Sequence, residues 1–271
     1  MSIRPGNART LIPLLLLGTI VSAAVFAPLL AAFPPDEVDL DRVGEGPSGT
    51  HWFGTDEKGR DVFSRVVYGA RFSLGIGVLA TAMALLLGAA AGLAAGYFGG
   101  TVDAVVQMIT DITLAFPSLL LAIGISVVLA PGFVTVFVAL ALVGWASIAR
   151  LVRGEVLGIR ESEYVQAARA GGVSSAGIIV RHILPNCLPV ILVAGSLKIG
   201  GFILGEAALS FLDLGVRPPD PAWGYMISAG REYLKSCPWM TVFPGFFLAL
   251  TVFSFNLLGD AVRDRLDPSF K

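Results

Sequence analysis

Residues 161–186, ESEYVQAARAGGVSSAGIIVRHILPN, form a polar stretch between two long apolar runs. Good helix formers fill its first half, and Gly171 and Gly172 supply the left-handed conformation that stops a helix. Ser174, or the serine after it, then caps a second short helix, which Pro185 ends. The stretch therefore predicts two short helices with a tight bend between them, a shape that suits close docking against another protein.

The composition of the chain is that of a membrane protein. Hydrophobic residues make up 55% of the 271 residues, charged residues only 14%, and the mean hydropathy is +0.78. A soluble domain carries about 25% charged residues. We therefore expect an all-α, polytopic membrane protein that contacts lipid. The net charge of −1 is confined to loops, and no feature of the sequence indicates binding to nucleic acid.

Six apolar runs are long enough to cross a bilayer. They are residues 11–32, 72–97, 102–130 with a break at Pro117, 133–149, 188–212 and 240–258. The first run ends without a clear cleavage site, so we interpret it as a retained span. The proposed inner segments hold ten Lys or Arg and the outer ones eight, which is a weak bias. Arg4 and Arg9 before the first run favour cytoplasmic N- and C-termini.

The polar stretch carries a resemblance to a known family. The letters QAA at 166–168, G at 172 and LP at 184–185 resemble the EAA loop of ABC-importer permease subunits. This chain has Gln166 where the family has Glu, and His182 where the family often has Ile. The ending RHILPN resembles the peptide and nickel branch of the family.

The resemblance implies that residues 150–187 are a cytoplasmic coupling loop whose helix sits in a groove of a separate ATPase subunit. The expected coupling residues are Tyr164, Val165, Gln166, Ala167, Ala168, Arg169, Gly172, Leu184 and Pro185. The alternative is an amphipathic interfacial loop without a partner.

A second string, GTDEKGRDVFSR at 54–65, precedes the second apolar run. Thr55 is a plausible N-cap, with Asp56 and Glu57 in the first turn of a helix. The string resembles the stretch before the second span of dipeptide, oligopeptide and nickel permeases. Its extracytoplasmic motif residues are Gly54, Thr55, Asp56, Gly59, Arg60 and Asp61. Alone, the string is also consistent with an ordinary capped surface helix and, less well, with a metal or phosphate site.

Small residues recur every four positions in the second run. They are Ala80, Ala84, Gly88, Gly92 and Gly96. Such a ridge lets two helix backbones approach closely, which is how spans associate in lipid. The run is therefore predicted to pack tightly against another helix.

Three charged residues lie deep inside apolar runs. Lys198 and Glu206 each cost roughly 2.5–3.5 kcal/mol at a helix centre, so their helix should be buried among others or line a cavity. They lie about 12 Å apart along a helix, too far to pair directly. Asp111 either lines a water-filled path or pairs with a neighbouring helix. These three residues are the candidates for a pathway or for helix pairing.

No catalytic chemistry is encoded. None of the four lysines follows a glycine, so no phosphate-binding G-x-x-x-x-G-K-[ST] loop exists. The two histidines lie in different loops, and no Cys/His cluster suits a metal. We expect no enzyme, no metal and no cofactor, with ATP and Mg²⁺ bound by partner subunits.

The family resemblance covers about residues 51–268 and implies a type I ABC-importer permease fold with six spans. It divides the chain into an N-terminal span with an extracytoplasmic segment (1–71) and a five-helix permease core (72–271). It implies an inner-membrane importer subunit for peptides or chelated nickel, working with a homologous second permease, one or two ATPase subunits and an extracytoplasmic binding protein. One alternative is a stand-alone ion-coupled transporter that uses Asp111, Lys198 and Glu206; another is a scaffold or receptor with no pathway.

Overall fold

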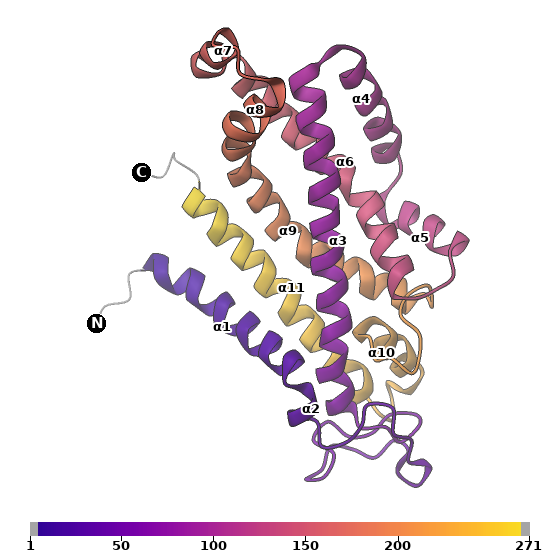
Figure 1. The fold of residues 1–271 in the computed structure, drawn as a ribbon. Helices are drawn as coiled ribbons and strands as arrows, with labels where there is room; N and C mark the ends of the chain where they lie inside the picture. The colour runs from indigo at the N-terminus through magenta and orange to yellow at the C-terminus, as the bar shows by residue number, and fades with distance from the viewer. Residues whose placement is uncertain (1–4, 267–271) are drawn as a thin grey trace.

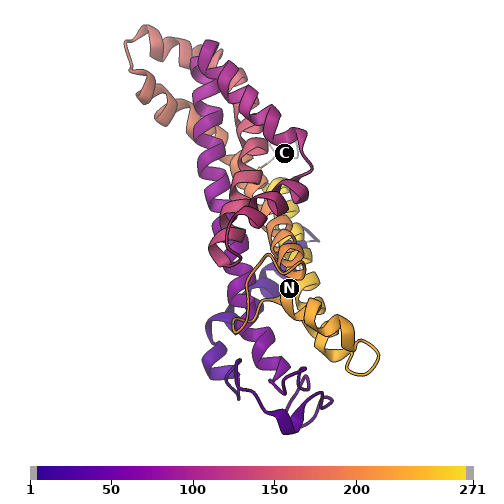
Figure 2. The same ribbon diagram turned by 90° about the vertical axis from the view of Figure 1, so that its right-hand side faces the viewer.

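The computed structural model describes residues 5–266, and the fold over these residues is helical (Figure 1). The helices are α1 (Pro5–Val25), α2 (Ala27–Leu30), α3 (Val62–Phe98), α4 (Gly100–Ala115), α5 (Ser118–Val128), α6 (Phe133–Arg160), α7 (Glu163–Ala170), α8 (Ser175–Ile178), α9 (Leu184–Phe211), α10 (Trp223–Gly230) and α11 (Trp239–Leu266). Short 3-10 turns lie at Leu40–Arg42 and Arg231–Tyr233, and one π turn lies at Ile179–Ile183. The molecule is elongated, with α7 and α8 at one end and the loop of residues 33–61 at the other (Figure 2).

Four helices of the described chain are long and apolar enough to cross a membrane. They are α3, α6, the continuous helix Ser175–Phe211 and α11. A fifth span results if α4 and α5 are counted as one, although they are bent by 92°. The apolar part of α1, Leu11–Val25, is shorter. The predicted all-helical, multi-pass architecture is confirmed, whereas the count of six spans stays a prediction.

The predicted break at Pro117 is confirmed. Pro117 and Phe116 have extended ψ angles of 126° and 139°, and they separate α4 from α5. Proline clashes with a helical conformation at the residue before it, so the helix ends there.

The predicted ridge of small residues packs against α6. All five of its members are buried. A Cβ on Gly88 would lie 2.6 Å from the Trp145 carbonyl oxygen, and a Cβ on Gly92 would lie 2.5 Å from that of Ala149. The two backbones therefore approach as closely as glycine allows.

Two helices are longer than the hydropathy pattern predicts. α3 begins at Val62 instead of residue 72, and α6 continues to Arg160 instead of ending at residue 149. The first part of the predicted coupling loop, residues 150–160, is therefore a continuation of α6. The extension of α6 keeps its arginines paired: Arg153 holds Asp103 with two hydrogen bonds, and Arg160 donates to the Gly96 carbonyl at 3.1 Å.

Pro185 does not end the second helix of the polar stretch, which corrects a further prediction. The helix from Ser175 runs through the π turn into α9 without a break. In the π turn the Leu184 N–H bonds to the Ile179 carbonyl, five residues back. This wider turn relieves the clash that a proline makes with the carbonyl four residues earlier.

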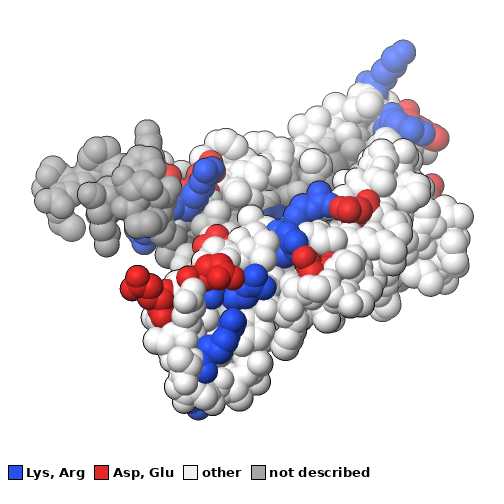
Figure 3. All heavy atoms as spheres, turned by 90° about the horizontal axis from the view of Figure 1, so that it is seen from above, with Lys and Arg blue, Asp and Glu red and all other residues white. Residues whose placement is uncertain are grey.

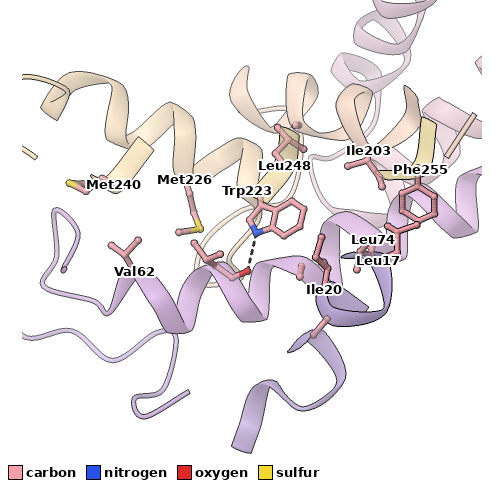
Figure 4. Close-up of a cluster of buried hydrophobic side chains, with 14 residues drawn as sticks. Leu17, Ile20, Val62, Leu74, Ile203, Trp223, Met226, Met240, Leu248 and Phe255 are labelled. Carbon is pink, nitrogen blue, oxygen red and sulfur yellow. Dashed lines mark hydrogen bonds between the residues drawn. The ribbon is translucent and has the colours of Figure 1, made fainter. Parts of the chain in front are cut away.

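Three apolar clusters follow one another along the bundle. The first gathers side chains of α1, α3, α9, α10 and α11 around the fully buried Trp223, whose indole nitrogen donates to the Val66 carbonyl at 2.9 Å (Figure 4). The second joins α3, α5, α6 and α9. The third packs α3 and α6 against α7 and the π turn, so that α7 rests directly on the bundle.

Candidate functional site

The α7–α8 hairpin is held to the bundle by one buried side chain of α7. Val165 is fully buried and joins Val156, Ile178 and Ile183 in the third apolar cluster. Val165 was predicted to be a coupling residue, and its side chain faces the bundle and not the outer surface of the hairpin. This contact fixes which face of α7 points outward.

The outward side of the hairpin holds most of the other predicted coupling residues. Exposed are Tyr164, Gln166, Ala167, Arg169, Gly172 and Pro185, while Ala168 and Leu184 are half-buried. The side chains at 167, 168 and 170 are alanines and project little from the helix. The surface of another protein can therefore approach the backbone of α7 closely. Acidic and basic side chains are interspersed on the face of the molecule at this end (Figure 3).

The bend between α7 and α8 depends on Gly172. Its φ is +79°, and the Val173 N–H bonds to the Ala168 carbonyl at 3.1 Å to close the end of α7. The Ser174 hydroxyl then accepts from the Gly177 N–H at 3.2 Å and caps α8. The predicted two-helix bend is confirmed, with Ser174 as the cap.

The base of the hairpin is joined to α3 and α4 by basic side chains. Arg150 of α6 pairs with Asp111 of α4, so Asp111 has the helix partner that was one of its two predicted roles. The Arg169 guanidinium lies 5.7 Å from the centroid of the Tyr97 ring. The pairing of Arg153 with Asp103, which completes this set, was not predicted, because spacing within α6 does not identify its neighbour helix.

Glu206 is fully buried where α3 meets α9. The Ser73 hydroxyl donates to one carboxyl oxygen at 2.9 Å, and the Ser210 hydroxyl donates to the other at 2.7 Å. Ser210 also accepts from the Val216 N–H at 3.3 Å. Glu206 therefore links α3, α9 and the loop that follows α9.

Replacing Glu206 with leucine is expected to destabilise the folded protein by about 1–3 kcal/mol, because two intramembrane hydrogen bonds are lost and two buried hydroxyls lose their acceptor. Glutamine keeps a hydrogen-bonding group of the same size and should stay within about 1 kcal/mol of the native protein. Thermal unfolding in detergent, followed by size-exclusion chromatography, measures both. Equal melting temperatures for Glu206→Leu and the native chain would show that the two hydrogen bonds do not stabilise the fold.

Lys198 lies at the middle of α9 and lines a cavity of about 560 Å³. The cavity is bounded by α9, α6, α5 and the end of α4. The Lys198 ammonium lies 5.4 Å from the centroid of the Phe202 ring. Asp111, Lys198 and Glu206 thus occupy three different environments, each with its own neighbours. This arrangement gives no support to a continuous ion relay through them.

The 33–61 loop is organised by buried charges from the second string. Asp56 accepts from the backbone N–H groups of Lys58 and Arg60, and from the Arg60 guanidinium at 2.7 Å. Arg60 also reaches Glu57, and Arg65 lies 3.4 Å from Asp56. The motif therefore has a clear structural role in folding this loop onto the start of α3.

Thr55 is not the N-cap of α3, which corrects the prediction. Asp61 caps the helix by accepting from the Ser64 N–H at 2.7 Å, and it also pairs with His51 at 2.9 Å. Thr55 is buried, with its hydroxyl accepting from the Glu45 N–H. The chain at Gly59 has a φ of +72°, and a Cβ there would lie 1.7 Å from the Asp39 carbonyl oxygen. This close contact fixes the turn and delays the helix start to Val62.

We expect Asp61→Ala to loosen the loop, because the mutation removes a cap, at a cost of about 1 kcal/mol, and takes away the partner of Nδ1 of the buried His51. Asp61→Asn keeps the cap and serves as the matched control. Limited trypsin digestion of membrane vesicles reports the change, since Arg60 and Arg65 are buried in the native loop. Cleavage rates that do not differ between the alanine and asparagine variants would contradict a capping role for Asp61.

The fold and these sites define a class: a polytopic helical membrane protein with an exposed two-helix hairpin at one end. Residues 84–271 match the family model described as "Binding-protein-dependent transport system inner membrane component". The chain belongs to this family, whose members are permease components of ABC transporters and not enzymes.

Several relatives are similar over almost the whole chain. The chain is 45% identical over 265 residues to the dipeptide transport system permease protein of Alkalihalophilus pseudofirmus, covering 98% of this chain and 87% of that protein. It is 40% identical to the oligopeptide transport system permease protein of Bacillus subtilis, with the same coverage of 98% and 87%. It is also 40% identical to the glutathione transport system permease protein of Pectobacterium atrosepticum, covering 93% of this chain and 84% of that protein.

A solved structure confirms the fold. A chain of an inward-facing methionine ABC transporter superposes with a TM-score of 0.60 at 19% identity, covering 76% of this chain and 97% of that one. At this identity the likeness concerns architecture alone, and it establishes the type I ABC-importer permease fold.

Proposed function

We propose that this chain is one of two permease subunits of an ATP-driven importer that moves peptides across the cytoplasmic membrane. Peptides are preferred over a nickel chelate because the relatives described above are named for dipeptide, oligopeptide and glutathione transport. In this proposal the chain has six spans, with α1 and the bent pair α4–α5 each counted as one. Both termini and the α7–α8 hairpin lie in the cytoplasm, and the 33–61 loop lies outside.

The observation that carries the proposal is the exposed face of α7. It is rich in small side chains, and it is held in place by Val165, Ile178 and Ile183 from below. The hairpin is also connected directly to two long helices: α6 precedes it in the chain, and the continuous helix Ser175–Phe211 begins within it. A displacement of α7 is therefore transmitted along two helices that reach the middle of the membrane.

The mechanism follows from this connection. An ATPase subunit binds α7 and changes its conformation when it binds ATP. This conformational change favours one of two arrangements of α6 and α9. The energy available is the difference in affinity of the ATPase for the two arrangements. ATP and Mg²⁺ are bound by the ATPase subunits, an extracytoplasmic binding protein delivers the peptide, and a homologous second permease completes the pathway.

Site-specific cross-linking tests this proposal. Cysteine is placed at the exposed Ala167 in a background where the two native cysteines, Cys187 and Cys237, are replaced. We expect a cross-link to the ATPase subunit in native membranes. Ser48→Cys, exposed at the opposite end of the molecule, is the matched control and should give none. Absence of any ATPase adduct at position 167, with intact chain in the membrane, would overturn the assignment.

A further inference from the structure

Lys198 is a positive charge in an unusual place. It lies at the centre of a helix that runs through the membrane, where a lysine costs roughly 2.5–3.5 kcal/mol on insertion scales. Such residues face a bundle interior or a water-filled cavity and have a functional partner. Within the described residues no carboxylate lies within ion-pair distance of Lys198, whose ammonium faces the Phe202 ring.

The other intramembrane acids are already engaged. Asp111 pairs with Arg150, and Glu206 receives hydrogen bonds from Ser73 and Ser210. Neither acid is among the residues that line the cavity of Lys198. The charge in the cavity is therefore not neutralised by the part of this chain that the structure describes.

The cavity has the size and lining of a site for a small peptide. Its volume of about 560 Å³ falls within the range of roughly 300–1,000 Å³ that is usual for small-molecule sites. Lys198 is its one charged lining residue, and Ser118 and Ser147 add hydroxyl groups. A Cβ on Gly201 would meet nothing within 4 Å, so this stretch of α9 leaves room for an occupant beside the ammonium.

We propose that Lys198 contacts the C-terminal carboxylate of a peptide during its passage through the pathway. The proposal rests on the proposed function and adds a substrate contact to it. A peptide carries one terminal carboxylate whatever its side chains, so a single ammonium recognises this class without selecting its sequence. The rest of the lining is mostly apolar and carries no second charge that would select among peptide side chains. Lys198 is therefore a specificity-determining residue for the free carboxylate.

The test compares a dipeptide that has a free C-terminus with its C-terminal amide. Uptake of each is measured in liposomes that hold the complete transporter, with saturating binding protein loaded with the peptide in question. The quantity of interest is the ratio of the two uptake rates for each permease variant. Because every variant meets the same loaded binding protein, the selectivity of that protein cancels between variants.

We expect the ratio of free-acid uptake to amide uptake to be about tenfold higher for the native chain than for Lys198→Met. This factor is typical of one charge-assisted hydrogen bond. Lys198→Arg keeps the positive charge and should keep the preference. Lys235→Met removes an exposed lysine far from the cavity and should leave the ratio unchanged. Lys198→Met removes a charge from an apolar helix, so membrane insertion is expected to be retained.

An unchanged ratio in Lys198→Met, with uptake of both peptides either normal or reduced equally, would overturn the proposal. It would show that the Lys198 ammonium does not distinguish the free carboxylate from its amide. Should Lys198→Met not assemble, Lys198→Gln gives the same comparison with a polar side chain. Failure of the native complex to take up either peptide contradicts the proposed function instead, so the two failures are distinguishable.

Discussion

Gly172→Val is expected to lower ATP-dependent uptake by at least about tenfold while leaving the protein in the membrane. The φ of +79° at Gly172 costs an L-residue roughly 1–2 kcal/mol, and a β-branched side chain more. Nothing lies within 4 Å of a Cβ built there, so the effect arises from the backbone and not from a clash. The angle between α7 and α8 therefore has to change, and the exposed face of α7 changes its orientation with it.

The adjacent glycine supplies the matched control. Gly171 has a φ of −73°, and a Cβ there would lie no closer than 3.4 Å to its neighbours. Gly171→Val should therefore stay within about twofold of native uptake, because neither strain nor close contact is introduced. Uptake into cells, normalised to the amount of permease in the membrane, separates the two. Equal uptake by both variants would mean that the bend at Gly172 does not determine coupling.

Sequence alone predicted the features that depend on local spacing. The ridge from Ala80 to Gly96 was evident because small residues recur at the period of a helix face. The bend at Gly172 was evident because two consecutive glycines interrupt strong helix formers. Both signals belong to short stretches of chain, and tertiary packing preserves them.

The errors arose where tertiary contacts decide between local alternatives. Thr55 and Asp61 are both good caps, and the contact of Gly59 with the Asp39 carbonyl selects the second. Pro185 is a strong signal for a helix end, yet the π turn before it lets the helix continue. The burial of Val165 could not be predicted either, because the resemblance identifies a segment and not the direction of each side chain. The cavity beside Lys198 is formed by four helices and leaves no signature in any one of them.

Gly92→Leu is expected to reduce folded permease in the membrane to less than about a tenth of the native amount, since overpacking a tight contact costs about 1–3 kcal/mol and often more where backbone is the obstacle. A Cβ at Gly92 would lie 2.5 Å from the Ala149 carbonyl oxygen and 2.8 Å from Cβ of Val152. Neither α3 nor α6 can shift alone, because the same ridge continues through Gly88 and Gly96.

Ala90→Leu makes a comparable change on the exposed face of α3 and should accumulate normally. Monodisperse protein recovered by size-exclusion chromatography in mild detergent gives the measurement. The contact between α3 and α6 matters for function as well as for folding. Arg150 and Arg153 of α6 pair with acids of α4, and the hairpin begins just after α6 ends at Arg160. Full recovery of Gly92→Leu would show that α3 and α6 separate easily, and a loosely packed α6 would transmit little of the motion of α7 into the membrane.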